Sequence, residues 1–228
     1  MPYFELKEEE FKLPPAYFAD IDGLLAVGGA MSTENMLKAY HAGAYYWHHP
    51  LKRIQWWSPD PRIVLYPANF DPGPTGITDG CQKLDIRFNE GFEAVLRLCQ
   101  THYNQQDQMS PHWLSERMFR IFMELHRLGY AHSIEVWKDE QVQGGLFGVA
   151  IGELFFGEYL VAEDTAMAQS LAVQLIQRLR EKGFKLLDMQ KPTVFVPGLE
   201  YEEMARITYL NHCKENELAF AGHHSTLL

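Results

Sequence analysis

The chain has 228 residues and a formal net charge of -10, and 46% of its residues are hydrophobic and 22% charged. This size and composition predict an ordinary soluble globular protein with one large domain or two small ones. The acidic balance excludes a general affinity for nucleic acids or anionic membranes, so any contact with phosphates requires a local basic patch. Three widely spaced cysteines indicate neither a disulfide framework nor a zinc knuckle.

The first part of the chain predicts a small α/β domain over residues 1–66. No signal peptide and no stretch long enough to span a bilayer is visible, which favours a cytoplasmic protein. Ser32 is expected to cap a helix that Gly43 ends. Short strands are expected at Ile54–Trp57 and Arg62–Tyr66, on either side of a proline-rich turn.

Residues 67–88 are predicted to be a connecting loop, because they begin with a stretch rich in Pro, Gly and Asp. Residues 89–228 then predict helix, helix, antiparallel meander, helix, strand and helix. This order indicates an α+β fold and is compatible with an acetyltransferase-like domain of the GNAT type. The expected helices are 89–103, 114–128, 165–181 and 201–215, and the expected strands are 133–137, 142–151, 154–161 and 185–190.

Three polar groups stand at the ends of apolar strands. Glu158 follows a long apolar run, and Asp188 and Gln190 follow another. A carboxylate among apolar neighbours loses hydration, so its presence there needs a reason. Asp188 and Gln190 are two residues apart, which on a strand places both side chains on one face. Together with Glu158 they form a group able to hold an amine and orient its lone pair. The alternative interpretation is that all three cap strand ends or bind loop backbone.

Aromatic side chains gather between Tyr40 and Trp57, and Trp113 stands further along the chain. Flat rings can stack on nucleobases, and they are also ordinary core material. The histidines show no helix-spaced pair with a carboxylate of the kind that metal hydrolases use, and no Gly-x-Ser-x-Gly elbow is present. The sequence therefore predicts no metal site and no serine-hydrolase triad.

Several segments resemble the leucyl/phenylalanyl-tRNA–protein transferases, in the same order along residues 13 to 210. The two most specific runs are Trp56–Arg62 (WWSPDPR) and Ala131–Trp137 (AHSIEVW). Further matching pieces are Gly23–Gly29, Leu37–Tyr40, Trp47, Gly144–Gly145, Gly148–Ala150, Phe156–Glu158 and Leu187–Asp188 with Gln190. The resemblance implies a small N-terminal α/β domain joined to an acetyltransferase-like C-terminal domain.

The resemblance also implies a reaction. Leu or Phe is moved from an aminoacyl-tRNA to the N-terminal α-amine of a protein that begins with Arg or Lys, which marks that protein for degradation. No metal or coenzyme is needed, because the ester to tRNA is already activated. A cytoplasmic protein, without membrane contact and monomeric, is expected.

By the same resemblance, Asp188 polarises Gln190, which orients the acceptor amine or relays its proton, and Glu158 holds the cationic acceptor. Trp47 and Trp113 clasp the terminal adenosine of the tRNA. The remaining members of the binding site are Tyr40, Leu146 and Leu160, the two leucines lining the pocket for the Leu or Phe side chain.

The chain also departs from the family pattern. Residues 159–169 replace a polar stretch that usually follows Gly-Glu, and residues 67–87 lack the usual basic cluster for tRNA. Each lost phosphate contact removes counterion release, which is the main source of non-specific affinity. A substitute patch is expected from Lys38, Lys52, Arg53 and Arg62.

Two other functions stay open at this point. The altered residues 159–169 favour a related acyltransferase with a changed donor or acceptor. The missing basic cluster favours a non-catalytic regulatory module. If coenzyme A were the donor, backbone amides at a strand–helix junction would have to hold its pyrophosphate, and Glu163 and Asp164 at this junction repel phosphate.

Overall fold

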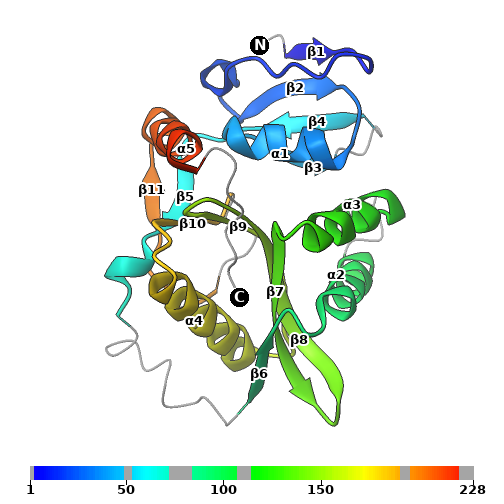
Figure 1. Ribbon diagram of the computed structural model, residues 1–228, viewed down its shortest axis with the longest axis vertical. Helices are drawn as coiled ribbons and strands as arrows, with labels where there is room; N and C mark the ends of the chain where they lie inside the picture. Colours follow the sequence, from blue (N-terminus) through cyan, green and yellow to red (C-terminus); the bar gives the residue numbers. More distant parts are fainter. Residues whose placement is uncertain (1–2, 49–52, 72–83, 107–113, 191–195, 221–228) are drawn as a thin grey trace.

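The structure, a computed structural model, describes residues 3–48, 53–71, 84–106, 114–190 and 196–220. Within these ranges it has two β-sheets with helices packed against them (Figure 1). The strands are β1 (Phe4–Leu6), β2 (Leu24–Gly28), β3 (Tyr45–His48), β4 (Ile54–Trp57), β5 (Arg62–Leu65), β6 (Asp85–Phe88), β7 (Ala131–Lys138), β8 (Gln141–Ile151), β9 (Leu154–Val161), β10 (Leu186–Asp188) and β11 (Glu202–Met204). The α-helices are α1 (Thr33–His41), α2 (Phe92–Gln106), α3 (Glu116–Arg127), α4 (Thr165–Glu181) and α5 (Arg206–Phe220), and a 3-10 turn, η1, covers Ala16–Phe18.

The N-terminal sheet has four strands in the order β1-β2-β4-β3, and α1 packs beside it (Figure 1). The short apolar run of β2 buries Leu25 and Ala26 completely, which is why this segment forms an inner strand. The Ser32 side chain accepts a hydrogen bond from the Asn35 backbone N–H at 3.2 Å, so the predicted helix cap of α1 is confirmed.

The second sheet has seven strands in the order β11-β5-β10-β9-β8-β7-β6. β7, β8 and β9 form the predicted antiparallel meander, and β10 runs parallel to β9 after the crossover through α4. α4 lies on one face of this sheet, and α2 and α3 lie on the other (Figure 1). The predicted α+β fold is confirmed, with the expected order of helices and strands from α2 to β10.

Two apolar cores follow from this layering. The inward face of α4 packs against the sheet through a group that includes Leu171, Leu175 and Ile176. The other core joins α2 and α3 to the opposite face of the sheet and to the N-terminal sheet. The second core is continuous between the two sheets, so side chains from the N-terminal part reach strands β9 and β10.

The final predicted helix is wrong at its start. Glu202–Met204 forms β11, which pairs with β5 in antiparallel fashion, and α5 begins only at Arg206. The reason is tertiary, because β5 offers an edge with unsatisfied backbone groups that a helix at this position would leave unpaired. The predicted strand over residues 185–190 is also too long, since β10 ends at Asp188.

The division into domains at residues 66 and 88 stays a prediction. β5 lies within residues 1–66, and β6 lies within the expected connecting loop. Both strands hydrogen-bond within the seven-stranded sheet, β5 next to β10 and β6 next to β7. No helix in the described ranges is long and apolar enough to cross a membrane.

Candidate active site

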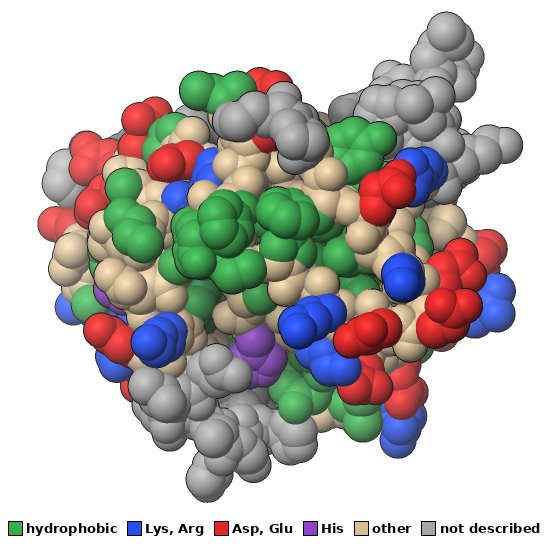
Figure 2. All heavy atoms as spheres, turned by 90° about the horizontal axis from the view of Figure 1, so that it is seen from above, with side chains coloured by type: hydrophobic (Ala, Val, Ile, Leu, Met, Phe, Trp, Pro, Cys, Tyr) green, Lys and Arg blue, Asp and Glu red, His purple; other side chains and the backbone are tan. Residues whose placement is uncertain are grey.

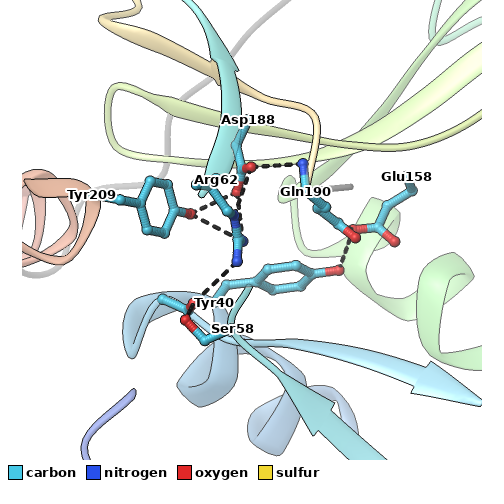
Figure 3. Close-up of polar contacts among 8 residues, drawn as sticks. Tyr40, Ser58, Arg62, Glu158, Asp188, Gln190 and Tyr209 are labelled. Atoms are coloured by element: carbon cyan, nitrogen blue, oxygen red, sulfur yellow. Dashed lines mark hydrogen bonds and ion pairs between the residues drawn. The ribbon is translucent and has the colours of Figure 1, made fainter. Parts of the chain in front are cut away.

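Asp188, the last residue of β10, is completely buried and is surrounded by donors (Figure 3). Its Oδ1 accepts hydrogen bonds from Arg62 Nε at 2.9 Å and from the Gln190 backbone N–H at 2.8 Å. Its Oδ2 accepts from Arg62 Nη2 at 2.7 Å and from the Tyr209 hydroxyl at 2.6 Å. The carboxylate is therefore paired with a cation and fully hydrogen-bonded, as a buried charge must be.

Arg62 is the residue of this site that the sequence analysis placed wrongly. It was expected in an exposed phosphate-binding patch, but it is 0% exposed and makes a bidentate ion pair with Asp188. Its guanidinium lies over the rings of Tyr45 and Tyr209, at 5.0 and 4.4 Å from their centroids. The Pro-Asp-Pro turn before β5 directs the strand into the large sheet, where the planar fork of Arg matches the carboxylate.

The rest of the expected patch is not assembled either. Lys38 pairs with Glu34 on α1, and Arg53 pairs with Glu5 of β1. Lys52 lies outside the described residues. Because Arg62 is buried and the two exposed cations are already paired, the described part of the chain has no basic patch from these residues.

Gln190 has a left-handed backbone conformation, with φ of 57°. This conformation is uncommon for a residue other than glycine and is found at sites where the surrounding structure holds it in place. Two contacts hold it here: the bond of its N–H to Asp188, and the bond of the Met189 N–H to the Ile63 carbonyl at 2.9 Å. Gln190 therefore leaves the strand, and its side chain is aimed by this turn instead of by strand alternation.

Glu158 is presented by a β-bulge in β9. Gly148 of β8 pairs with Gly157, and Phe147 pairs with Tyr159, so Glu158 is the extra residue without an opposite partner in β8. In such a bulge two consecutive side chains turn to the same side of the sheet. Tyr159 packs into the core between the two sheets, and Glu158 reaches toward α1.

Tyr40, Glu158 and Gln190 form a second hydrogen-bonded group beside Asp188 (Figure 3). Glu158 Oε1 accepts from the Tyr40 hydroxyl at 2.7 Å and from Gln190 Nε2 at 2.6 Å. Burial raises the pKa of Glu158 to about 7, although the hydrogen bonds from Tyr40 and Gln190 lower it. The charge of Asp188 raises this pKa further, and the charge of Arg62 lowers it. A half-buried carboxylate that titrates near neutrality is typical of an active site.

The structure thus brings together Asp188, Gln190, Glu158 and Tyr40 among the residues expected from the sequence. The contact between Asp188 and Gln190 runs through the backbone N–H, not through the amide side chain that the resemblance suggested. Tyr40 is 1% exposed and its ring lies 4.8 Å from that of Phe156, so it also fills the core.

The two expected pocket leucines face each other across the sheet. Leu146 of β8 and Leu160 of β9 are register partners on the face that α4 covers. Leu146 is buried and Leu160 is half-buried. They lie on the face opposite to Glu158 and Tyr159, because the bulge turns Glu158 to the same face as Tyr159, and Leu160, the next residue, alternates to the other face.

Trp47 lies in β3, opposite Gln55 of β4, and packs half-buried against the core. Trp113, its expected partner around the adenosine, lies outside the described residues. In the described ranges no group of three or more His, Cys, Asp or Glu side chains is arranged to hold a metal ion.

The roles of Arg62 and Tyr209 as partners of Asp188 were not predicted from the sequence. Arg62 stands in the motif WWSPDPR, so its place in that run was a usable signal. Tyr209 stands in the final helix without any distinctive neighbours, and only the packing of α5 against β5 and β10 reveals it.

Comparison with known proteins adds an independent observation. The family model described as leucyl/phenylalanyl-tRNA protein transferase matches residues 78–214. A relative of this name from Syntrophobacter fumaroxidans is 37% identical over 222 residues, covering 95% of this chain and 92% of the relative. Another from Pseudomonas fluorescens strain Pf0-1 is 37% identical over 211 residues, covering 91% and 92%.

Similarity to solved structures is more distant. A conserved protein of unknown function from Bacteroides thetaiotaomicron aligns with a TM-score of 0.44 and 11% identity, covering 82% of this chain and 64% of that one. A tandem GNAT protein from the clavulanic acid biosynthesis pathway aligns with a TM-score of 0.37 and 14% identity, covering 80% and 61%. These two likenesses are too remote to bear on function.

Proposed function

Because this chain belongs to the leucyl/phenylalanyl-tRNA–protein transferase family, we propose that it moves Leu or Phe from an aminoacyl-tRNA to a protein whose first residue is Arg or Lys. The reaction is an aminolysis: the α-amine of the acceptor attacks the ester carbonyl, an amide forms, and the ribose hydroxyl of the tRNA leaves. The product would be a protein marked for degradation, in the cytoplasm, with the enzyme acting as a monomer.

The observation that carries this proposal is the convergence of Glu158 and Gln190 beside the buried Arg62–Asp188 pair. An ester that is already activated needs little more than a positioned nucleophile and a group to receive its proton. The carboxylate of Glu158 would attract the cationic N-terminus of the acceptor. The amide of Gln190 would orient the amine, and Asp188 would hold the turn that aims Gln190.

The donor would be held by the remaining expected residues. Trp47 and Trp113 would stack on the terminal adenosine. Tyr40 would support the binding site through its hydrogen bond to Glu158. Leu146 and Leu160 would line the side-chain pocket. An apolar pocket separates side chains by only about 1–3 kcal/mol per methylene, which supports a mixed preference for Leu and Phe.

A coenzyme A donor is disfavoured by the start of α4. The Asp164 side chain accepts the Met167 backbone N–H at 2.8 Å, and thereby occupies the helix N-terminus that a pyrophosphate would need. Glu163 next to it is exposed and adds a second negative charge. Thermal stabilisation by acetyl-coenzyme A would contradict this conclusion.

The test is transfer of radiolabelled Leu or Phe from charged tRNA to a short peptide that begins with Arg. The same peptide with an acetylated N-terminus removes the nucleophile, and a peptide that begins with Ser removes the cationic side chain. We expect label only in the Arg peptide. Absence of transfer at low salt, with a working family enzyme in a parallel reaction, would overturn the proposal.

A further inference from the structure

The proposed transfer needs an atom that receives a proton. The attacking amine loses a proton as its bond to the carbonyl carbon forms, and the leaving ribose oxygen gains one as its bond breaks. A positioned group that takes the first proton and returns it to the leaving oxygen balances the reaction without a cofactor. Asp188, Gln190 and Glu158 are the candidates, and their hydrogen bonds decide which of them can accept a proton.

Asp188 has no room for a proton. A carboxylate offers about four acceptor positions, and four donors from Arg62, Tyr209 and Gln190 fill them. The side chain is also 0% exposed, so a substrate amine cannot reach it without breaking the ion pair. A buried pair that loses one partner leaves an uncompensated charge, which is the costliest arrangement for a protein interior. Asp188 is therefore a positioning residue.

Gln190 has an amide, which accepts a hydrogen bond through its oxygen but does not hold a proton at neutral pH. Its Nε2 donates to Glu158 Oε1 at 2.6 Å, so the amide is oriented with its nitrogen toward Glu158. The amide oxygen consequently points to the other side of the group. Gln190 is suited to orient an amine. A proton relayed through Gln190 would have to end on Asp188, whose acceptor positions are already filled.

Within the described residues, Glu158 has one oxygen that accepts hydrogen bonds and one that accepts none. Oε1 accepts both the Tyr40 hydroxyl and Gln190 Nε2. No donor among the described residues reaches Oε2, and Oε2 does not belong to the buried polar atoms that lack a partner there. Since the residue is half-buried, this oxygen is the atom of the group that a ligand can approach.

We propose that Glu158 Oε2 takes the proton from the acceptor amine and delivers it to the ribose oxygen of the departing tRNA. The inference rests on the proposed transferase function and deepens it. The amine nitrogen forms a bond with the carbonyl carbon, its proton passes to Oε2, the carbon–oxygen ester bond breaks, and the proton moves to the leaving oxygen. Glu158 is then ionised again, and the Tyr40 and Gln190 bonds hold its other oxygen throughout.

The charges around Glu158 suit this step. Tyr40 faces it from α1, and Tyr45 is the first residue of β3. Arg62 on β5 and Asp188 on β10 carry opposite charges, which lower and raise the pKa of Glu158 respectively. Burial is the largest influence and raises the pKa of Glu158 to about 7. An ordinary α-amine has a pKa of about 8, so the carboxylate and the amine differ little in proton affinity, as efficient transfer requires.

The first test replaces Glu158 with Gln, which keeps the shape and the acceptor for Tyr40 and Gln190 but cannot take a proton. We expect kcat at saturating Arg-peptide to fall about 100-fold or more, with an unchanged unfolding temperature. An increase in KM with unchanged kcat would mean that Glu158 only binds the acceptor, and would overturn the inference.

The second test uses the pH dependence of kcat. In the wild-type enzyme kcat should rise with pH as Glu158 ionises, with a midpoint near 7, and Glu158→Gln should lack this rise. The Tyr40 hydroxyl stabilises the ionised carboxylate and so lowers its pKa. Tyr40→Phe should therefore move the midpoint to higher pH.

Tyr45→Phe is the matched control, because it removes another buried tyrosine hydroxyl, one that has no hydrogen-bond partner within the described residues. Its midpoint should equal that of the wild type. The inference is overturned if Tyr40→Phe leaves the midpoint of the rise in kcat unchanged, or if Glu158→Gln still shows a rise in kcat with a midpoint near pH 7. Failure of the wild-type enzyme to transfer at all would instead reject the proposed function, so the two failures are distinguishable.

Discussion

The candidate site contains one buried ion pair, Arg62 with Asp188, and its neighbours explain why this pair is tolerated in the interior. Every acceptor position of the carboxylate is filled, and the guanidinium is covered by the rings of Tyr45 and Tyr209. The pair also joins two segments 126 residues apart in the chain. A pair of this kind contributes less to net stability than to holding β5, β10 and α5 in one arrangement.

This role predicts the outcome of Arg62→Met. The substitution keeps most of the volume but leaves Asp188 buried without its cation, so we expect a loss of about 3–5 kcal/mol in the free energy of unfolding. Urea denaturation followed by circular dichroism measures it. Arg53→Met is the control: its pair with Glu5 is half-exposed, with side-chain exposures of 50% and 67%, and should matter by less than about 1 kcal/mol. Equal effects of the two substitutions would contradict the argument.

At the scale of the element, the bulge in β9 decides where the reactive carboxylate lies. The sequence predicts β9 correctly as a strand, yet strict alternation would place Glu158 and Tyr159 on opposite faces. Gly148 and Gly157 stand opposite each other next to the bulge. A methyl group would clash at Gly148 but would fit at Gly157. Comparing Gly→Ala at the two positions therefore separates damage to the bulge from the general effect of losing a glycine.

We expect Gly148→Ala to destabilise the protein by about 1–3 kcal/mol and to lower transfer activity. A Cβ atom at this position would collide with the Phe156 carbonyl oxygen and lie 2.5 Å from the Phe155 ring. At Gly157 the nearest atom would be the Asp188 carbonyl oxygen at 3.6 Å, an ordinary contact. Gly157→Ala should therefore cost less than about 1 kcal/mol. Thermal unfolding of both variants, with transfer assays beside it, checks the difference.

At the scale of the whole molecule, charge limits how a nucleic acid can bind. The net charge is -10, and several cations at the surface are paired, including the half-buried Arg87 with Asp85 and the exposed Arg97 with Glu116 and Lys185 with Glu153. Figure 2 shows one face of the molecule, where basic and acidic side chains are interspersed around hydrophobic ones. Large apolar side chains exposed near the N-terminal sheet include Phe4, Tyr17, Phe18 and Ile21.

This distribution predicts weak salt dependence of tRNA binding. With about two phosphate contacts, affinity should fall roughly tenfold between 50 and 200 mM salt, whereas six to ten contacts would lower it by about 10³–10⁵. Fluorescence titration of labelled aminoacyl-tRNA at several salt concentrations gives the slope. A steep slope would contradict this prediction.

Much of the fold could be predicted from local pattern. Ser32 caps α1, the meander of β7 to β9 follows from alternating and apolar runs, and α4 follows from its helical periodicity. β2, β3, β6 and β11 were missed, whereas β4, β5 and β10, which are also short, were predicted as strands. A segment this short carries no readable period, and whether it becomes a strand depends on a neighbouring edge with unpaired backbone groups.

The sequence by itself determined the family, the α+β order of elements, and the chemical types at the site, because motifs and periodicity are local properties of the chain. Only the tertiary structure decided that Arg62 is a buried partner of Asp188, that Tyr209 joins them, and that Gln190 contacts Glu158 through a left-handed turn. These contacts join residues from β5, β9, β10 and α5. Their geometry depends on sheet pairing, a bulge and desolvation, which arise when distant segments pack together.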